Sequence, residues 1–326
     1  MSVVTQSNGV DLARRRSRPS SRLERAYLLY RKRVALCRTE NQRNRVHIAV
    51  ENYMTPAELR YFASALAADA PDSPSHEWIT RLGAFMPTQT VRPVEFERRT
   101  VLKGMTHYTA GIGSPPQKTL LIGFAGGHHR LMLPMPSWLD CLNPAFYDMI
   151  VLRDFSRRIF TVGIPGLGAD FFEAMAGLRR RVDLNAYRNT IAVGTSSGGL
   201  PALLGAIELR LDRGIWIGGL DFPTLATRLR SGGASEARYA ALLASRPEPF
   251  PDLLLVYCGS HVADAAAANG LHQRVPSRLW EVRNCASHVV LSWKLERQRL
   301  PLFLSKILGQ SLEHGGPVAT GGNHDR

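Results

Sequence analysis

The sequence lacks any apolar run long enough to cross a bilayer, and no apolar segment follows its N-terminal basic residues. A membrane-spanning helix needs about 18 or more consecutive apolar residues. A secretory signal needs an apolar core behind its basic start. Neither is therefore expected, and the sequence predicts a cytoplasmic protein with a sizeable apolar core, since 44% of its residues are hydrophobic.

Cysteine is also scarce, with four residues in a chain of 326. Cys37, Cys141, Cys258 and Cys285 lie far apart in the sequence, and none forms a C-x-x-C pair. This spacing indicates neither a zinc site nor a disulfide framework. Reduced thiols, which are usual in a cytoplasm, are expected at all four positions.

Acidic residues are fewer than basic ones, 27 against 41, and the formal net charge is +14. Residues 1–45 hold much of the excess, with twelve Lys and Arg against three Asp and Glu. Such a segment can bind an anionic partner, either nucleic acid or a membrane surface. A solvated arm without a partner is the alternative interpretation.

The first 90 residues carry helical signals but no chemical motif. Residues 1–20 lack apolar periodicity and are expected to form a disordered basic arm. Ser21 can cap a helix over residues 22–37, and Thr55, Pro56 and Glu58 are typical of the start of a second helix. Residues 21–90 are therefore interpreted as a helical extension. The Gly-rich, polar residues 311–326 are expected to be a disordered tail.

Residues 91–310 alternate apolar runs typical of strands with amphipathic helical segments. This alternation predicts an α/β domain with a mostly parallel sheet and helices on both faces. A helix is expected over residues 170–181 and a single closing helix over residues 289–308. Strands are expected over residues 91–97, 106–109, 117–124, 147–152, 159–162, 190–193, 214–217, 252–257 and 277–282.

One of these strands leads into a candidate nucleophile. Residues 190–193 are β-branched and apolar, Gly194-Thr-Ser-Ser-Gly198 follows, and an apolar helical pattern begins at Leu200. Strand, tight turn and helix are the context in which G-x-S-x-G presents a reactive serine. The pattern requires Gly two residues before and two residues after the serine. Ser196 has Gly194 and Gly198 at these positions, whereas Ser197 has Thr195 and Gly199. Ser196 is therefore the candidate nucleophile.

A base and an acid follow the later strands. A serine hydroxyl needs a base to take its proton, and a histidine base needs a carboxylate to orient it. Asp264 follows the strand at 252–257, and His288 follows the strand at 277–282. The carboxyl ends of parallel strands share one edge of a sheet, so both are expected near Ser196. Asp221, which follows the strand at 214–217, is the alternative acid.

With the order Ser196, Asp264, His288, the chain resembles the α/β-hydrolase family over roughly residues 90–310. The resemblance implies an oxyanion hole made by the backbone N–H of Ser197 and a second N–H from the loop after an early strand. That loop is Phe124-Ala-Gly-Gly-His-His129, which makes Ala125 or Gly126 the expected second donor. His128 and His129 lack the further ligands of a metal site, so none is predicted.

The sequence thus predicts a serine hydrolase or acyltransferase that acts on an ester, thioester or amide. Such an enzyme needs a small-molecule or acyl substrate and no metal or organic cofactor. The alternative is a non-catalytic protein of the same fold that binds an anionic partner through its basic N-terminal segment.

Overall fold

The computed structural model of the chain describes residues 21–88, 91–232 and 235–309. The basic arm predicted for residues 1–20 and the tail predicted for residues 311–326 lie outside the described residues. Within the described part, no helix is long and apolar enough to span a membrane.

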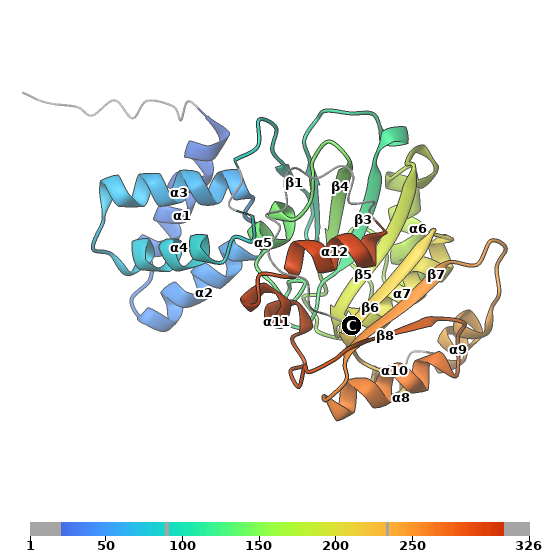
Figure 1. Cartoon of the computed structure of the whole chain (residues 1–326). Helices are drawn as coiled ribbons and strands as arrows, with labels where there is room; N and C mark the ends of the chain where they lie inside the picture. Colours follow the sequence, from blue (N-terminus) through green and yellow to red (C-terminus); the bar gives the residue numbers. More distant parts are fainter. Residues whose placement is uncertain (1–20, 89–90, 233–234, 310–326) are drawn as a thin grey trace, which may run out of the picture.

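A single eight-stranded sheet organises most of the chain (Figure 1), with strand order β1-β2-β4-β3-β5-β6-β7-β8. The first two strands pair antiparallel, β2 also pairs antiparallel with β4, and all later pairs are parallel. The strands are β1 (Glu97–Leu102), β2 (Met105–Thr109), β3 (Thr119–Phe124), β4 (Tyr147–Leu152), β5 (Asn189–Ser196), β6 (Arg213–Gly219), β7 (Asp252–Cys258) and β8 (Arg278–Val282).

Helices cover both faces of this sheet, and alternate strand residues enter two separate cores. In β3, for example, Leu120 and Ile122 face one core and Leu121 faces the other. A strand buried on both faces is apolar throughout, which is why β3 to β7 are near-continuous hydrophobic runs. The first core contains α6 (Phe171–Arg181), α7 (Gly199–Leu209), α8 (Phe222–Gly232), α9 (Glu236–Ala244) and α10 (Val262–His272). The second contains α5 (Met135–Asp140), α11 (Val290–Glu296) and α12 (Leu300–Leu308). The predicted fold class, an α/β domain with a mostly parallel sheet and helices on both faces, is confirmed.

Four helices precede the sheet and group together at one side of it (Figure 1): α1 (Arg22–Ala35), α2 (Glu40–Glu51), α3 (Pro56–Asp69) and α4 (Pro74–Ala84). We call residues 21–88, which consist of these helices and their connections, the helical layer. They share a core of their own, in which the ring of Trp78 stacks on those of Tyr30 and His47. The predicted helix starts are confirmed, since Ser21 caps α1 and Thr55 forms a capping box with Glu58 at α3.

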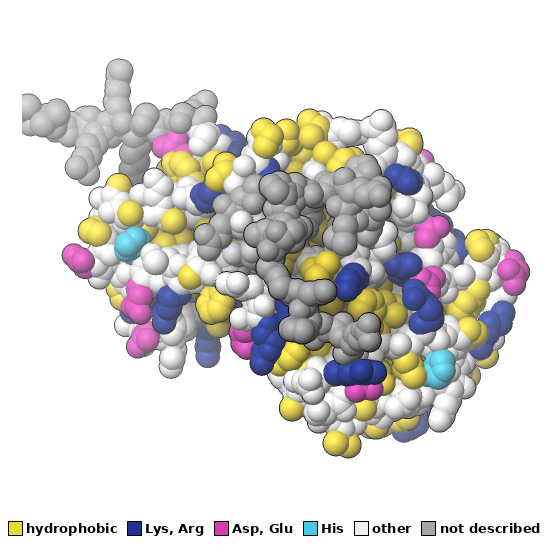
Figure 2. Space-filling model, in the orientation of Figure 1, with side chains coloured by type: hydrophobic (Ala, Val, Ile, Leu, Met, Phe, Trp, Pro, Cys, Tyr) yellow, Lys and Arg dark blue, Asp and Glu magenta, His cyan; other side chains and the backbone are white. Residues whose placement is uncertain are grey.

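Charged side chains are spread over the face that Figure 2 shows, with Lys and Arg interleaved among acidic and hydrophobic groups. Several basic side chains of the protein are paired across the fold. Arg22 binds Glu97 and Arg31 binds Asp69, so part of the positive charge of α1 is already matched by acids of the chain.

Three expected elements are wrong. Residues 91–96 are not a strand, since Pro93 has no N–H to donate to a ladder, and β1 begins only at Glu97. Residues 159–162 form a turn in which Ile159 and Phe160 have φ of 58° and 60°, and Asp154 accepts the N–H of Phe160. The closing helix is two helices, because Pro301 starts α12 after a break at residues 297–299.

Candidate active site

Ser196 lies at the turn between β5 and α7, where the strand stops and the helix begins. Its φ is +53°, a left-handed value that is uncommon for a residue with a side chain. Strain of this kind persists only where the surrounding structure imposes it, and it is frequent at functional sites. The side chain remains partly exposed while Thr195 beside it is fully buried.

The glycines on either side of this turn are required by close backbone approach. A Cβ on Gly194 would lie 2.0 Å from the carbonyl oxygen of Gly198, and a Cβ on Gly198 would lie 2.1 Å from that of Phe124. Neither gap admits a side chain. The two flanking Gly of the G-x-S-x-G pattern therefore let strand, turn and helix pack at the distances that the fold adopts.

His288 reaches this turn from the loop that follows β8, and Asp264 reaches it from the first turn of α10, the helix after β7. The Nε2 atom of His288 lies 3.1 Å from the Oγ of Ser196. The Nδ1 atom of the same ring lies 2.9 Å from Asp264 Oδ1 and 3.1 Å from Oδ2. Asp264 is only 3% exposed, so its charge is shielded from water and directed at the imidazole. The three side chains form one hydrogen-bonded chain.

The hydrogen bond that His288 donates to Asp264 raises the pKa of His288 above its usual value of 6.5, against the opposing effect of burial, and the charge of Asp264 raises it further. The carboxylate accepts a hydrogen bond at Nδ1 and thereby favours the tautomer whose Nε2 carries a lone pair. An Nε2 in that state can accept a proton from the hydroxyl of Ser196.

The alternative acid has another role. Asp221 accepts hydrogen bonds from the backbone N–H of Thr224, at 3.0 Å, and from its hydroxyl, at 2.6 Å. It therefore satisfies an otherwise unpaired donor in the first turn of α8. No hydrogen bond joins Asp221 to His288 in the described part of the chain, and Asp264 takes that place.

The loop after β3 differs from the expected oxyanion site. The N–H of Ala125 donates to Leu152 O and the N–H of Gly126 donates to Arg130 O, both at 3.0 Å. Both expected second donors are thus already engaged, because Ala125 extends the β3–β4 ladder and Gly126 closes a tight turn. Among the described residues, the N–H groups of Ser197 and Gly127 have no hydrogen-bond acceptor. Gly127 is adjacent to the turn at residues 194–198, which we call the nucleophile turn after the role predicted for Ser196, since a Cβ on Gly127 would lie 3.8 Å from Ser197 Oγ.

The expectation of four reduced thiols is wrong for one pair. Cys258 and Cys285 form a disulfide with Cα atoms 4.9 Å apart. Cys258 ends β7 and Cys285 follows β8, so the bridge joins the loop of the acid to the loop of the base. Cys37 and Cys141 are free. The two cysteines are 27 residues apart in the sequence, and they come close only because β7 and β8 lie side by side in the sheet. The bridge also removes the support that reduced thiols lent to a cytoplasmic location.

His261, which the sequence patterns did not single out, also lies at the site. It caps α10 by accepting the N–H of Asp264 at its Nδ1, 3.2 Å away, and its ring centroid lies 5.6 Å from that of His288. Its position three residues before Asp264 is the helix-cap spacing that could have identified it.

His261, Asp264 and His288 also form the one group in the described ranges whose ligand atoms lie close enough to hold a metal ion, all within 4.8 Å of one another. An ion there would have to replace the hydrogen bond between Asp264 and His288. Metal binding and the hydrogen-bonded chain to Ser196 are therefore mutually exclusive uses of these side chains.

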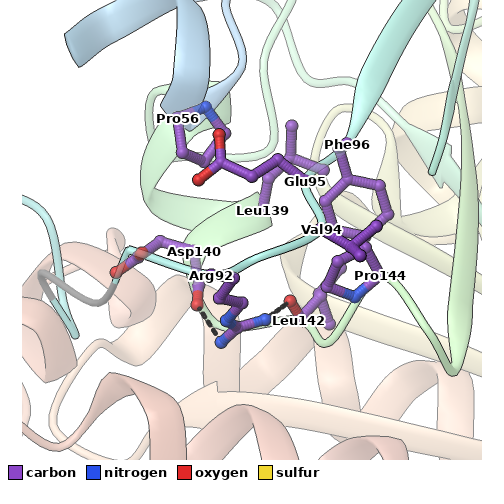
Figure 3. Close-up of a pocket in the computed structure, with 9 residues that line it drawn as sticks. All are labelled: Pro56, Arg92, Val94, Glu95, Phe96, Leu139, Asp140, Leu142 and Pro144. Carbon is purple, nitrogen blue, oxygen red and sulfur yellow. Dashed lines mark hydrogen bonds between the residues drawn. The ribbon is translucent and has the colours of Figure 1, made fainter.

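Two pockets among the described residues lie away from these side chains. One, drawn in Figure 3, is lined by residues of the 92–96 segment, α5 and its C-terminal loop, and the start of α3, and Arg92 donates across it to the carbonyls of Asp140 and Leu142. Its volume is about 10 Å³, room for about one water molecule. A second, of about 370 Å³, lies between α3 and α4 beside Asp140. Neither contains Ser196 or His288.

No protein-family model matches the chain, and no curated protein matches its sequence. Solved structures of similar fold include an α/β hydrolase from the sediment metagenome of the Mar Chica lagoon, Morocco, which is 15% identical over 65% of this chain and 96% of its own, with a TM-score of 0.43. The enterobactin esterase of Shigella flexneri is 17% identical over 69% of this chain and 62% of its own, with a TM-score of 0.41. The capsule O-acetyltransferase of Neisseria meningitidis serogroup A is 10% identical over 70% of this chain and 99% of its own, with a TM-score of 0.45.

Proposed function

We propose that this chain is a serine hydrolase that cleaves an ester, thioester or amide through an acyl-enzyme intermediate on Ser196. The observation that carries the proposal is the position of the His288 ring, with Nε2 3.1 Å from Ser196 Oγ and Nδ1 2.9 Å from Asp264 Oδ1. Nucleophile, base and orienting carboxylate at such distances are the geometry of acyl transfer on serine.

In the acylation step, Ser196 Oγ attacks the carbonyl carbon of the substrate while His288 Nε2 takes the hydroxyl proton. The carbonyl π bond becomes an oxyanion, and the imidazolium is stabilised by the buried carboxylate of Asp264. When the tetrahedral intermediate collapses, the bond to the leaving group breaks and His288 returns its proton to that group. Ser196 is then acylated and the ring is neutral.

The oxyanion needs donors that are already oriented, since removing one such donor from an active site of this kind costs about 10²–10³-fold in rate. We assign this role to the N–H groups of Ser197 and Gly127. Both flank the nucleophile turn and neither has an acceptor in the described part of the protein. This assignment replaces Ala125 and Gly126, whose N–H groups are already bonded.

In the second half of the reaction, His288 takes a proton from an incoming water, which attacks the acyl carbon, and the proton passes to Ser196 Oγ as the acyl–oxygen bond breaks. An alcohol that enters in place of water gives transfer rather than hydrolysis. The residues named so far serve both outcomes equally.

A fluorophosphonate probe tests the proposal, because it phosphonylates a serine only when a base activates it. The full chain should be labelled at one site, and Ser196→Ala should abolish the label. Ser197→Ala is the matched control: it removes the neighbouring hydroxyl, keeps the backbone N–H, and should retain labelling. Folded wild-type protein that takes up no label, or label that persists in Ser196→Ala, contradicts the proposal.

The alternative of a non-catalytic binding protein rests on the basic N-terminal segment. The predicted arm, residues 1–20, lies outside the described residues, and no contact within the described part of the chain favours an anionic partner over solvent. No second function is therefore proposed.

A further inference from the structure

The segment 125–130 after β3 forms one wall of the candidate active site, and its backbone is in close contact with the nucleophile turn. A Cβ on Gly126 would lie 2.8 Å from Thr195 O and 3.3 Å from Ser196 Cβ. The segment is a tight turn, closed by the hydrogen bonds from Gly126 N to Arg130 O and from His129 N to Gly126 O. We call it the oxyanion loop, after the role that we assign to Gly127.

The far side of the oxyanion loop is held by the helical layer. Asn52, which follows the last residue of α2, donates from its side-chain Nδ2 to His128 O at 2.9 Å. Glu51, the preceding residue, forms an ion pair with Arg130 at 3.4 Å. Two consecutive residues of the layer therefore bind two residues of the loop that follow Gly127.

Arg153 also joins the oxyanion loop to the helical layer. Its side chain is fully buried just after β4 and donates from Nε to His129 O at 3.0 Å. Its Nη2 donates to the backbone oxygen of Asn52, and its guanidinium lies 4.1 Å from the ring centroid of Tyr53. One cation thus bonds the oxyanion loop and the helical layer at once.

The Asn52 side chain has a feature that packing alone does not explain. It is 4% exposed, and its Oδ1 is buried without a hydrogen-bond partner in the described part of the chain. A buried, unsatisfied polar atom is destabilising, and an apolar side chain of similar size would avoid that cost. The amide is therefore best accounted for by what its Nδ2 does, which is to hold the carbonyl of His128.

We propose that Asn52 is a positioning residue for catalysis: together with Arg153 it fixes the peptide groups beyond Gly127, so that the Gly127 N–H is directed at the oxyanion. The helical layer is then a part of the catalytic apparatus, although it lies outside the α/β fold that carries Ser196, His288 and Asp264. This inference rests on the proposed hydrolase function and adds to it a role for residues 21–88.

Preorganised donors accelerate a reaction because they need no reorientation as charge develops. If Asn52 supplies part of that order, its loss reduces the rate of the chemical step and leaves substrate binding largely unchanged. Asn52→Leu is the sharpest variant, since Leu has a similar size, removes the donor, and also removes the unsatisfied Oδ1. Its fold should be as stable as the wild type.

The experiment measures phosphonylation of the full-length chain by a fluorophosphonate. For Asn52→Leu we expect the maximal labelling rate to fall about tenfold or more, the half-saturating probe concentration to change less than twofold, and the melting temperature not to fall. Tyr27→Phe is the control, because it removes another polar contact of the layer, from Tyr27 OH to Asp69, without touching the oxyanion loop. It should label at the wild-type rate.

Amide hydrogen exchange separates this inference from the proposed function. Asn52→Leu should speed exchange at residues 126–130 whether or not the protein is an enzyme, and Tyr27→Phe should not. Wild-type labelling rates in Asn52→Leu overturn the positioning role, and unchanged exchange overturns the contact's ability to order the loop. Absence of Ser196-dependent labelling in the wild type refutes the proposed function instead, and with it any catalytic role for Asn52.

Discussion

His288 Nδ1 lies 2.9 Å from Asp264 Oδ1, although the two residues are 24 positions apart in the chain, with most of helix α10 and all of strand β8 between them. The acid is buried while the His288 side chain is 39% exposed. The ring is therefore anchored from the protein interior at one nitrogen and presented to Ser196 at the other. Its orientation depends on a carboxylate that is almost entirely buried.

Asp264→Asn should reduce the rate of Ser196-dependent reaction by about 10³–10⁴-fold, because an amide neither selects the required tautomer of His288 nor stabilises its cation. The matched control is Asp221→Asn, which removes the alternative acid and should retain nearly full activity. Initial rates on an activated ester such as p-nitrophenyl acetate, or labelling rates with a fluorophosphonate, measure both. Equal losses in the two variants would contradict the assignment of Asp264.

The dependence of activity on pH should also reflect the effect of Asp264 on His288. His288 must be neutral to act as a base, and its pKa is raised by Asp264, so activity should fall as pH drops through a value above 6.5. In Asp264→Asn the raising effect is lost and burial still lowers the pKa, so the residual activity should persist to lower pH. Profiles of kcat/KM against pH measure the shift. If kcat/KM falls at the same acidic pH in the wild type and in Asp264→Asn, a group other than His288 controls that fall.

Gly126→Ala should impair the reaction, since its Cβ would meet the backbone oxygen of Thr195 at 2.8 Å and push the oxyanion loop away from the nucleophile turn. We expect kcat to fall at least tenfold. Gly270→Ala is the control, because Gly270 lies in α10 with nothing within 4 Å of the added carbon. It should keep kcat and raise stability by about 0.5–1 kcal/mol, as expected for Gly replaced by Ala within a helix.

The disulfide between Cys258 and Cys285 should stabilise the loops of the acid and the base. Its loss should lower the free energy of unfolding by about 3 kcal/mol, the typical effect of closing a loop of this length. Denaturant unfolding with and without a reductant measures it. The reductant should lower the midpoint of the wild type and have no effect on the Cys258→Ala, Cys285→Ala double variant. If the reductant leaves the unfolding midpoint of the wild type unchanged, the disulfide is absent in solution.

His47 should make the helical layer sensitive to acid. Burial, with help from Arg43 and Arg81, lowers the pKa of its ring from 6.5 to about 4, so the folded state holds the neutral form. The unfolded chain takes up a proton below about pH 6.5, so the stabilisation is complete above that pH, is lost as pH falls toward 4, and is constant below. A shift of this size corresponds to about 3 kcal/mol.

Replacing His47 by Gln should flatten that dependence between pH 6.5 and 4, even if the variant is less stable at neutral pH. Free energies of unfolding across this range, from urea titrations of both proteins, measure the difference in slope. Parallel curves for the two proteins would contradict a role for His47 in the acid sensitivity.

The sequence by itself determined the local features of this protein. The Gly194–Gly198 turn, the caps at Ser21 and Thr55, and the apolar strands depend on neighbours a few residues away, through backbone sterics, short-range hydrogen bonds and side-chain periodicity. Those signals were sufficient to predict the fold class and to nominate Ser196, Asp264 and His288 from their places after successive strands. They failed where apolar residues enter the core from a turn, as at Ile159, and where a single proline divides a helical pattern, as at Pro301.

Only the tertiary structure decided which of two acids faces His288, which N–H groups beside Ser196 are unengaged, and that Cys258 meets Cys285. Each depends on atoms from distant segments whose separation is set by strand register and by packing of the whole sheet. The attachment of Asn52 to the oxyanion loop is of the same kind, since a side chain 76 residues away from His128 becomes its partner only once the helical layer has docked. Periodicity in a sequence encodes which face of an element is buried, but not which polar atoms meet across it.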